Sequence, residues 1–116
     1  MDLPNLYNKF VCEGIIACNN QKYEEALKLF SKAGKACPKR IEPDFYKALT
    51  LIIFSVKLLP KEMKEKKRSY LESAMKTISK HETIDNNPSL YMIRGLLHYA
   101  LEDLDAALKD FDQCLN

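Results

Sequence analysis

The chain has 116 residues, of which 47% are apolar and 29% are charged, and a formal net charge of +2. This balance is typical of a folded globular protein of one domain, and it excludes a disordered or low-complexity chain. So small a net charge says little about partners.

The sequence shows neither a membrane span nor a secretion signal. The longest apolar run, around Leu51 to Leu59, is interrupted by Ser55 and Lys57 and is shorter than the roughly 18 residues that a span needs. The opening MDLPNLYNKF lacks the basic start and the apolar run of a signal peptide. We therefore expect an intracellular, cytoplasmic protein in a reducing compartment, and the sequence does not indicate an organelle.

The first forty residues predict two helices. Pro4 suits the first turn of one helix, which runs to about Cys18 and ends in the polar turn 19–21. The second covers about 22–37, because apolar residues recur there at helical spacing and Pro38 follows its end. The apolar stripe of this second helix consists of Tyr23, Ala26, Leu27, Phe30 and Ala33.

The third predicted helix opens at Pro43, ends at Pro60 and is apolar nearly all round. A helix on the surface would not tolerate that composition. It is therefore either the buried centre of the protein or a helix with one face used for binding. A fourth helix follows within 61–80, and its apolar residues at helical spacing are Leu71, Ala74, Met75 and Ile78.

The first half of the segment 61–80 is strongly basic, and we expect the fourth helix to begin early and to extend about two or three turns beyond its neighbours. Glu62 and Glu65 supply counter-charges at helical spacing, and no aromatic residue lies among the cations. The pattern favours a solvated helix face, with an acidic protein partner as the next interpretation and nucleic acid as the last. This basic patch consists of Lys61, Lys64, Lys66, Lys67 and Arg68.

Two further helices are predicted at the end of the sequence. After a loop at 81–87, Asn87 can cap a fifth helix that has Pro88 in its first turn. Asp103 can cap a sixth helix, which runs to the last residue. A stack of helices needs a polar end, so either something covers this last helix or the chain is an excerpt of a longer one.

The same three residue types recur at identical spacings in two parts of the chain. They are Gly14, Ala26 and Phe30 in the first part, and Gly95, Ala107 and Phe111 in the second. Two short helices can lie close together only where small residues face each other, with a large side chain beside them to fill the remaining space. A single hairpin of this kind cannot bury its own apolar face, so the units must stack.

These units resemble the tetratricopeptide repeat, a helix-turn-helix unit with a period of about 34 residues. The matching residues are Phe10, Gly14, Ala26, Phe30, Ala33 and Pro38 in the first unit, and Tyr91, Gly95, Ala107 and Phe111 in the last, where Cys114 replaces a small alanine. The resemblance implies an all-α fold, a right-handed α-solenoid of three tetratricopeptide-like repeats in a single domain, 1–116. The expected repeats cover about 7–40, 41–87 and 88–116.

The spacing of the two glycines gives the number of units. Gly14 and Gly95 lie 81 positions apart, which is two periods of about 34 residues plus about 13 more. The middle repeat is therefore predicted to be enlarged by about 13 residues. Ala48 stands there in place of the signature glycine.

The sequence offers no arrangement that suits catalysis. It has no nucleophile beside a base, no Gly-rich phosphate loop and no cluster with metal-ligand spacing. His98 takes the position of a packed aromatic residue of the resembled family, so we expect a partly buried histidine. We predict that the chain is not an enzyme and uses no cofactor or metal. The four cysteines, expected to be small buried hydrophobes, are Cys12, Cys18, Cys37 and Cys114.

The resemblance also implies a concave groove, lined by the first helix of each repeat, that receives a peptide or helix of another protein. Members of the family that grip a chaperone's C-terminal carboxylate use lysine and asparagine at the positions of Val11 and Ile15. Because neither side chain here can donate a hydrogen bond, that role is disfavoured. The expected groove residues are Asn8, Val11, Ile15, Cys18, Asn19, Phe45, Leu49, Ile52, Ser89, Met92, Leu96 and Tyr99.

We therefore expect a non-catalytic scaffold or adaptor whose apolar groove binds a peptide or an amphipathic helix of a partner protein, with no membrane partner. An alternative is a structural module that homo-oligomerises through its terminal helices, since self-association would cover the same apolar residues. A weaker alternative is RNA binding through the basic segment Lys61–Arg68.

Overall fold

A computed structural model describes residues 2–58, 63–81 and 87–115 of the chain. Within these ranges the chain is helical and contains no β-strand, which confirms the all-α prediction. The elements are α1 (Leu3–Asn19), α2 (Tyr23–Ala36), α3 (Glu42–Ile53), the π-helix η1 (Phe54–Leu58), α4 (Lys64–Ser79), α5 (Pro88–Ala100) and α6 (Leu104–Leu115).

Side-chain caps define where several helices begin. The carboxylate of Asp2 accepts a hydrogen bond from the backbone N–H of Asn5 at 3.0 Å, at the start of α1. The predicted caps of the last two helices are confirmed. The side-chain oxygen of Asn87 accepts from the N–H of Ser89 at 3.0 Å, and the carboxylate of Asp103 accepts from the N–H of Ala106 at 3.2 Å.

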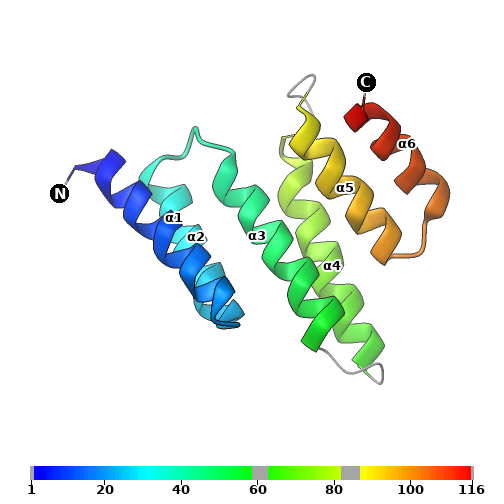
Figure 1. Cartoon of the computed structure of the whole chain (residues 1–116), viewed down its shortest axis with the longest axis horizontal. Coiled ribbons are helices and arrows are strands. Elements are labelled where there is room, and N and C mark those ends of the chain that lie inside the picture. The colour runs from blue at the N-terminus through cyan, green and yellow to red at the C-terminus, as the bar shows by residue number, and fades with distance from the viewer. Residues whose placement is uncertain (1, 59–62, 82–86, 116) are drawn as a thin grey trace.

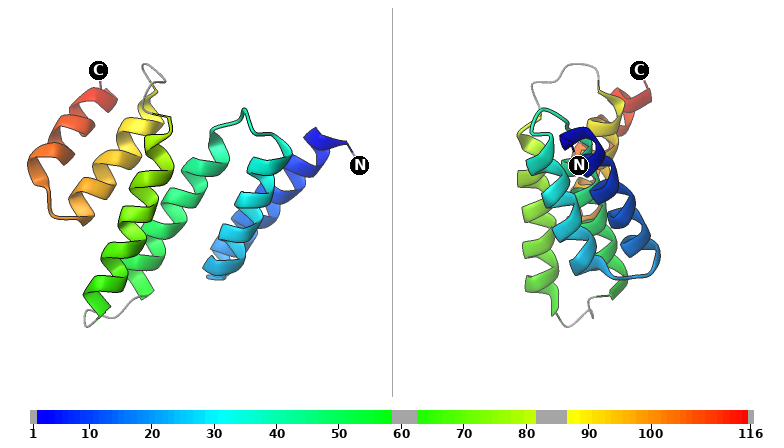
Figure 2. Two further views of the ribbon diagram at one scale, coloured as in Figure 1. Left: turned by 180° about the vertical axis from the view of Figure 1, so that it is seen from behind. Right: turned by 90° about the vertical axis from the view of Figure 1, so that its left-hand side faces the viewer.

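The six α-helices of the described residues form three hairpins that stand side by side (Figure 1). Helix α1 packs on α2, α3 on α4 and α5 on α6, while α2 packs on α3 and α4 on α5 between hairpins. The first helices of the hairpins lie toward the viewer in Figure 1, and α2 and α4 come to the front when the molecule is seen from behind (Figure 2). The second helix of one hairpin is therefore covered by the first helix of the next, α2 by α3 and α4 by α5.

The first and third hairpins have the same internal contact. The ring of Phe30 lies against Gly14, and the ring of Phe111 lies against Gly95. A β-carbon placed on either glycine would be 2.6 Å from the Cε1 atom of the ring. Glycine is thus required at both positions because the ring occupies the space of a side chain.

The turns of these two hairpins also match. Gln21 and Glu102, which are 81 positions apart, adopt the left-handed backbone conformation with φ of 62° and 69°. These are the non-glycine residues with positive φ in the described part of the chain. The repeat seen in the sequence is therefore a repeat of backbone geometry as well.

The middle hairpin is longer than the other two. Ala48 and Ala74 are 26 positions apart, whereas the corresponding residues of the outer hairpins are 12 apart. The extra length is shared by both helices, since α3 continues as η1 and α4 already begins at Lys64, and both reach beyond the neighbouring hairpins in Figure 1. The prediction that the fourth helix begins early and extends beyond its neighbours is confirmed for the described residues, and α3 with η1 extends as well. Lys61, the first residue of the predicted basic patch, lies outside the described residues.

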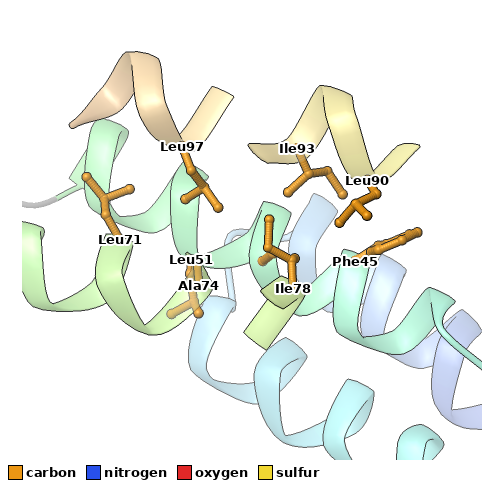
Figure 3. Close-up of a cluster of buried hydrophobic side chains, with 9 residues drawn as sticks. Phe45, Leu51, Leu71, Ala74, Ile78, Leu90, Ile93 and Leu97 are labelled. Atoms are coloured by element: carbon orange, nitrogen blue, oxygen red, sulfur yellow. The ribbon is translucent and has the colours of Figure 1, made fainter. Parts of the chain in front are cut away.

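The main hydrophobic core lies between α3, α4 and α5 (Figure 3). Helix α3 also contacts α2 on another side, where Tyr46 stacks on Phe30 with 5.2 Å between ring centres. Its nearly uniform apolar composition is thus explained by burial at the centre of the protein. The core residues are Phe45, Ala48, Leu51, Leu71, Ala74, Ile78, Leu90, Ile93 and Leu97.

A partly buried ion pair joins α5 to α6. The guanidinium of Arg94 donates two hydrogen bonds to the carboxylate of Asp110, at 2.9 Å from Nε and 2.7 Å from Nη2. Asp110 is buried, and the half-buried His98 has its Nε2 atom 3.6 Å from the same carboxylate. The expectation of a partly buried His98 is confirmed, with an acidic neighbour that the sequence pattern did not indicate.

The cysteines differ from the prediction. All four are free, and Cys18, Cys37 and Cys114 are only half-buried, while Cys12 is exposed. Cys12 was expected in a buried position, but it lies on the outer side of α1, where no other described helix covers it.

The glycine contact can be tested with matched substitutions. We expect Gly14→Ala and Gly95→Ala each to lower the free energy of unfolding by about 1 to 3 kcal/mol, because the new methyl group must displace a phenylalanine ring. Gly34→Ala is the control, since its β-carbon would meet Pro43 at an ordinary 3.8 Å. That substitution should be neutral or stabilising by up to about 1 kcal/mol, from helix propensity alone. Urea unfolding followed by circular dichroism measures all three, and equal effects would contradict the assigned contact.

Candidate functional site

An open apolar hollow of about 660 Å³ lies between the long middle hairpin and the third hairpin. Helix α3 and η1 form one wall, α5 forms another, and the turn into α6 closes one end. Its volume lies within the range of roughly 300–1,000 Å³ that is typical of binding pockets. The residues that line it are Ile52, Val56, Lys67, Leu96, Tyr99, Ala100, Glu102 and Leu104.

Helix α5 supplies the hollow with one of its two faces. Leu96 and Tyr99 are three residues apart and therefore share a side of the helix. Both are exposed, whereas Leu97 between them points into the core and is 0% exposed. One side of α5 thus holds the fold together while the other presents apolar surface.

The π-helix positions the opposite wall. The hydroxyl of the buried Ser55 donates to the backbone carbonyl of Ile52 at 3.0 Å, which satisfies the polar group inside the protein. The next residue, Val56, is exposed and lines the hollow. π-Helical segments are rare and are frequent at functional sites, so η1 is a second indication that this wall is used.

Three of the predicted groove residues, Ile52, Leu96 and Tyr99, come together in the hollow. Met92 is exposed one turn before Leu96 on the same side of α5, and Ser89 is exposed at the start of that helix. These residues form a continuous strip from the start of α5 to the hollow.

Other predicted groove residues lie elsewhere. Phe45 is only 7% exposed and belongs to the core, where its ring meets the ring of His81, so its place in the groove was wrong. Leu49 is partly buried against the same core. The residues expected from α1 do not line the hollow: Asn8, Ile15 and Asn19 are exposed, Val11 is half-buried, and the Cys18 Sγ lies 3.3 Å from the Thr50 hydroxyl.

The sequence did not indicate Val56, Glu102 or Leu104 as site residues. Val56 falls in the inserted part of the middle unit, for which the outer units offer no counterpart. Glu102 lies in the turn between α5 and α6, and Leu104 begins α6. The spacing of 81 positions between Gly14 and Gly95 is the sequence signal that could have placed this turn, because it relates Glu102 to Gln21 in the first hairpin.

Part of the predicted basic patch flanks the apolar hollow. A smaller basic hollow of about 380 Å³ lies between α4 and the turn into α6, and Lys67, Ala100 and Glu102 line both hollows. Lys64 and Arg68 also face this basic hollow, and Lys66 is exposed but lines neither. The basic hollow is lined by Lys64, Glu65, Lys67, Arg68, Leu71, Ala100, Leu101 and Glu102.

The charges around the basic hollow are mixed. Arg68 donates to the carboxylate of Glu72 at 3.0 Å, an exposed pair that contributes little to stability. Glu65 and Glu102 face the same space as the cations. Away from this region, burial and then the nearby carboxylate of Glu42 raise the pKa of Tyr7, which does not line either hollow.

A polar contact outside the two hollows joins the two helices of the middle hairpin. His81 Nε2 lies 2.7 Å from the Asp44 carboxylate and so ties the end of α4 to the start of α3.

No group of three or more potential metal-ligating side chains occurs among the residues that the structure describes. None of the helices in the described part of the chain has both the length and the apolar composition needed to cross a membrane.

Comparison with models of known protein families gives no match to this chain, and a search of curated proteins finds no similar sequence. Its function must therefore be inferred from its own residues.

The two faces of α5 should respond differently to substitution. Tyr99→Asp should change the free energy of unfolding by no more than about 0.5 kcal/mol, because the side chain is largely exposed. Leu97→Asp should cost about 3 kcal/mol or more, because it places a charge in the core. Urea unfolding of both variants measures the difference, and a large loss of stability in Tyr99→Asp would place that residue in the core.

Proposed function

We propose that this chain is a protein-interaction module built as a solenoid of three tetratricopeptide-like repeats, and that it binds an apolar helix or peptide of another protein. The repeated glycine–phenylalanine contact and the repeated left-handed turn support the solenoid, because they recur at one spacing in the first and last hairpins. The module would act as a cytoplasmic scaffold or adaptor without catalysis.

The observation that carries the proposal is the exposed apolar lining of the hollow. Val56, Leu96 and Tyr99 are all exposed although they are large and apolar, and they converge on one hollow from two elements. Contiguous exposed apolar surface on a folded protein commonly marks an interaction site. Scattered single residues would not carry the same weight.

The shape of the site favours a guest with regularly spaced apolar side chains. Met92, Leu96 and Tyr99 follow one side of α5 at helical spacing, so they offer an elongated strip that leads into the hollow. An amphipathic helix with anchors at every third or fourth residue matches such a strip. The anchor that enters the hollow would be large and apolar.

The basic hollow adds a preference for acidic neighbours in the guest. Lys67 lies at the boundary between the apolar and the basic hollow, so it can meet a carboxylate on a peptide whose anchor is already bound. Such a charge would speed association and orient the guest more than it would raise affinity. The proposed partner is therefore an apolar helix or peptide that carries an acidic residue beside its main anchor.

Selection from a random peptide library displayed on phage tests this function. We expect enriched peptides to combine apolar residues at helical spacing with an acidic residue. Their affinity should fall tenfold or more in Leu96→Asp, and less strongly in Lys67→Glu, with Lys66→Glu as a matched control that lines neither hollow. Fluorescence anisotropy measures these affinities. Peptides that bind Leu96→Asp as well as the unchanged chain would contradict the assigned site, and a selection without enrichment would contradict peptide binding.

A further inference from the structure

Helix α6 has an exposed apolar face that the proposed groove does not explain. Leu104, Leu108 and Leu115 are large, apolar and exposed, with Leu108 at 62%. Their spacings of four and seven residues place them along one side of the helix. Only Leu104 also lines the apolar hollow, so most of this leucine face lies outside it.

The other two hairpins show what covers this face. Leu104 occupies the position of Tyr23 in α2 and of Leu71 in α4, counted from the alanines Ala26, Ala74 and Ala107 that recur in the three hairpins. Tyr23 is buried and meets the ring of Phe54 in η1, with 5.8 Å between ring centres. Leu71 is 1% exposed in the core.

The next position along the face behaves in the same way. Leu108 corresponds to Leu27 in α2 and to Met75 in α4, and both of those residues pack against the main core. In each case the first helix of the following hairpin provides the cover, α3 for α2 and α5 for α4. The leucine face of α6 therefore has the composition of an internal interface, with its cover missing from the described part of the chain.

Helix α1 presents the complementary half of such an interface. Ile16 occupies the position of Thr50 in α3 and Leu97 in α5, which face the preceding hairpins and are 2% and 0% exposed. Ile16 itself is 57% exposed. The exposed Cys12 likewise takes the position of Tyr46, which stacks on Phe30.

We infer that copies of this chain associate head to tail, with the leucine face of α6 in one copy covered by α1 of the next, as α2 is covered by α3. Both halves of the contact are found on the same chain, at positions that are buried or half-buried where two hairpins meet. The interface joins two different surfaces, so it continues into a ring or a filament and does not stop at a symmetric pair.

Charge also favours α1 of the next copy, and not its α6, as the helix that covers the leucine face. Asp112 lies one turn before Leu115. Leu115 takes the position of Gly34, which lies next to Pro43 where α2 meets α3. Lys9 takes the position of Pro43, so the head-to-tail contact places Lys9 beside Leu115, one helical turn from Asp112. Pairing α6 with another α6 would instead bring the carboxylates of Asp105 and Asp112 from both copies together, which is unfavourable.

Sedimentation equilibrium of the 116-residue chain tests this inference with two variants. The unchanged chain should show a mass above that of the monomer and rising with concentration. Leu108→Asp disables the α6 face and Ile16→Asp disables the α1 face, so each alone should be monomeric. An equimolar mixture of the two still contains one intact face of each kind, and it should form a dimer and nothing larger.

Each outcome decides the matter. A monomeric unchanged chain at all concentrations would overturn the inference, since the leucine face would then have another cover. If Ile16→Asp still self-associates while Leu108→Asp does not, α6 pairs with α6 and the head-to-tail contact is overturned. Leu3→Asp is the matched control, because Leu3 is an equally exposed apolar residue on the other side of α1 and should leave association unchanged. Circular dichroism checks the folding of every variant, and Leu108→Ser with Ile16→Ser replace any that unfold.

The inference does not depend on the proposed peptide site. Leu108 and Ile16 do not line the apolar hollow, so Leu108→Asp and Ile16→Asp both keep every residue that lines it. Conversely, failure of the peptide selection would not affect the mass measurements.

Discussion

The contact on which this fold depends is an aromatic ring placed where a glycine has no side chain. It fixes the distance between the two helices of a hairpin, because any larger residue at Gly14 or Gly95 would collide with the ring. The middle hairpin solves the same problem with different residues. Ala48 replaces the glycine and the smaller Ile78 replaces the phenylalanine, and both are fully buried in the core. A gain in volume on one helix is thus matched by a loss on the other, which close packing requires.

The departure from the repeat, and not the repeat itself, creates the candidate site. Lengthening the middle hairpin adds Val56 and Lys67, which line one hollow together with the end of α5 and the turn into α6. The apolar hollow and the basic hollow therefore both arise from the inserted residues, which combine an apolar wall from η1 with cations from the start of α4.

Local signals in the sequence predicted the helices well, because caps and periodicity depend on residues close in the chain. Asn87 and Asp103 cap the helices that they were expected to cap, and Leu96 and Tyr99 lie on the side of α5 that the repeat register indicated. The failures concern tertiary neighbours. The same register placed Phe45 in the groove, but His81 at the end of α4 lies against its ring, and the sequence does not reveal that contact across 36 positions. The sites formed by the insertion had no counterpart elsewhere in the chain from which to predict them.

The two proposed surfaces meet at Leu104, which lines the apolar hollow and also begins the leucine face of α6. Burial of one leucine or isoleucine contributes roughly 1.5 to 3 kcal/mol, whereas association costs roughly 4 to 15 kcal/mol in lost freedom. An interface built on a few such residues is therefore weak and reversible, unlike the covered interfaces within the chain, which carry no such cost. A guest that packs against Leu104 changes the surface available to the next copy. Peptide binding and assembly would then be thermodynamically linked, and each would alter the affinity of the other by the same factor.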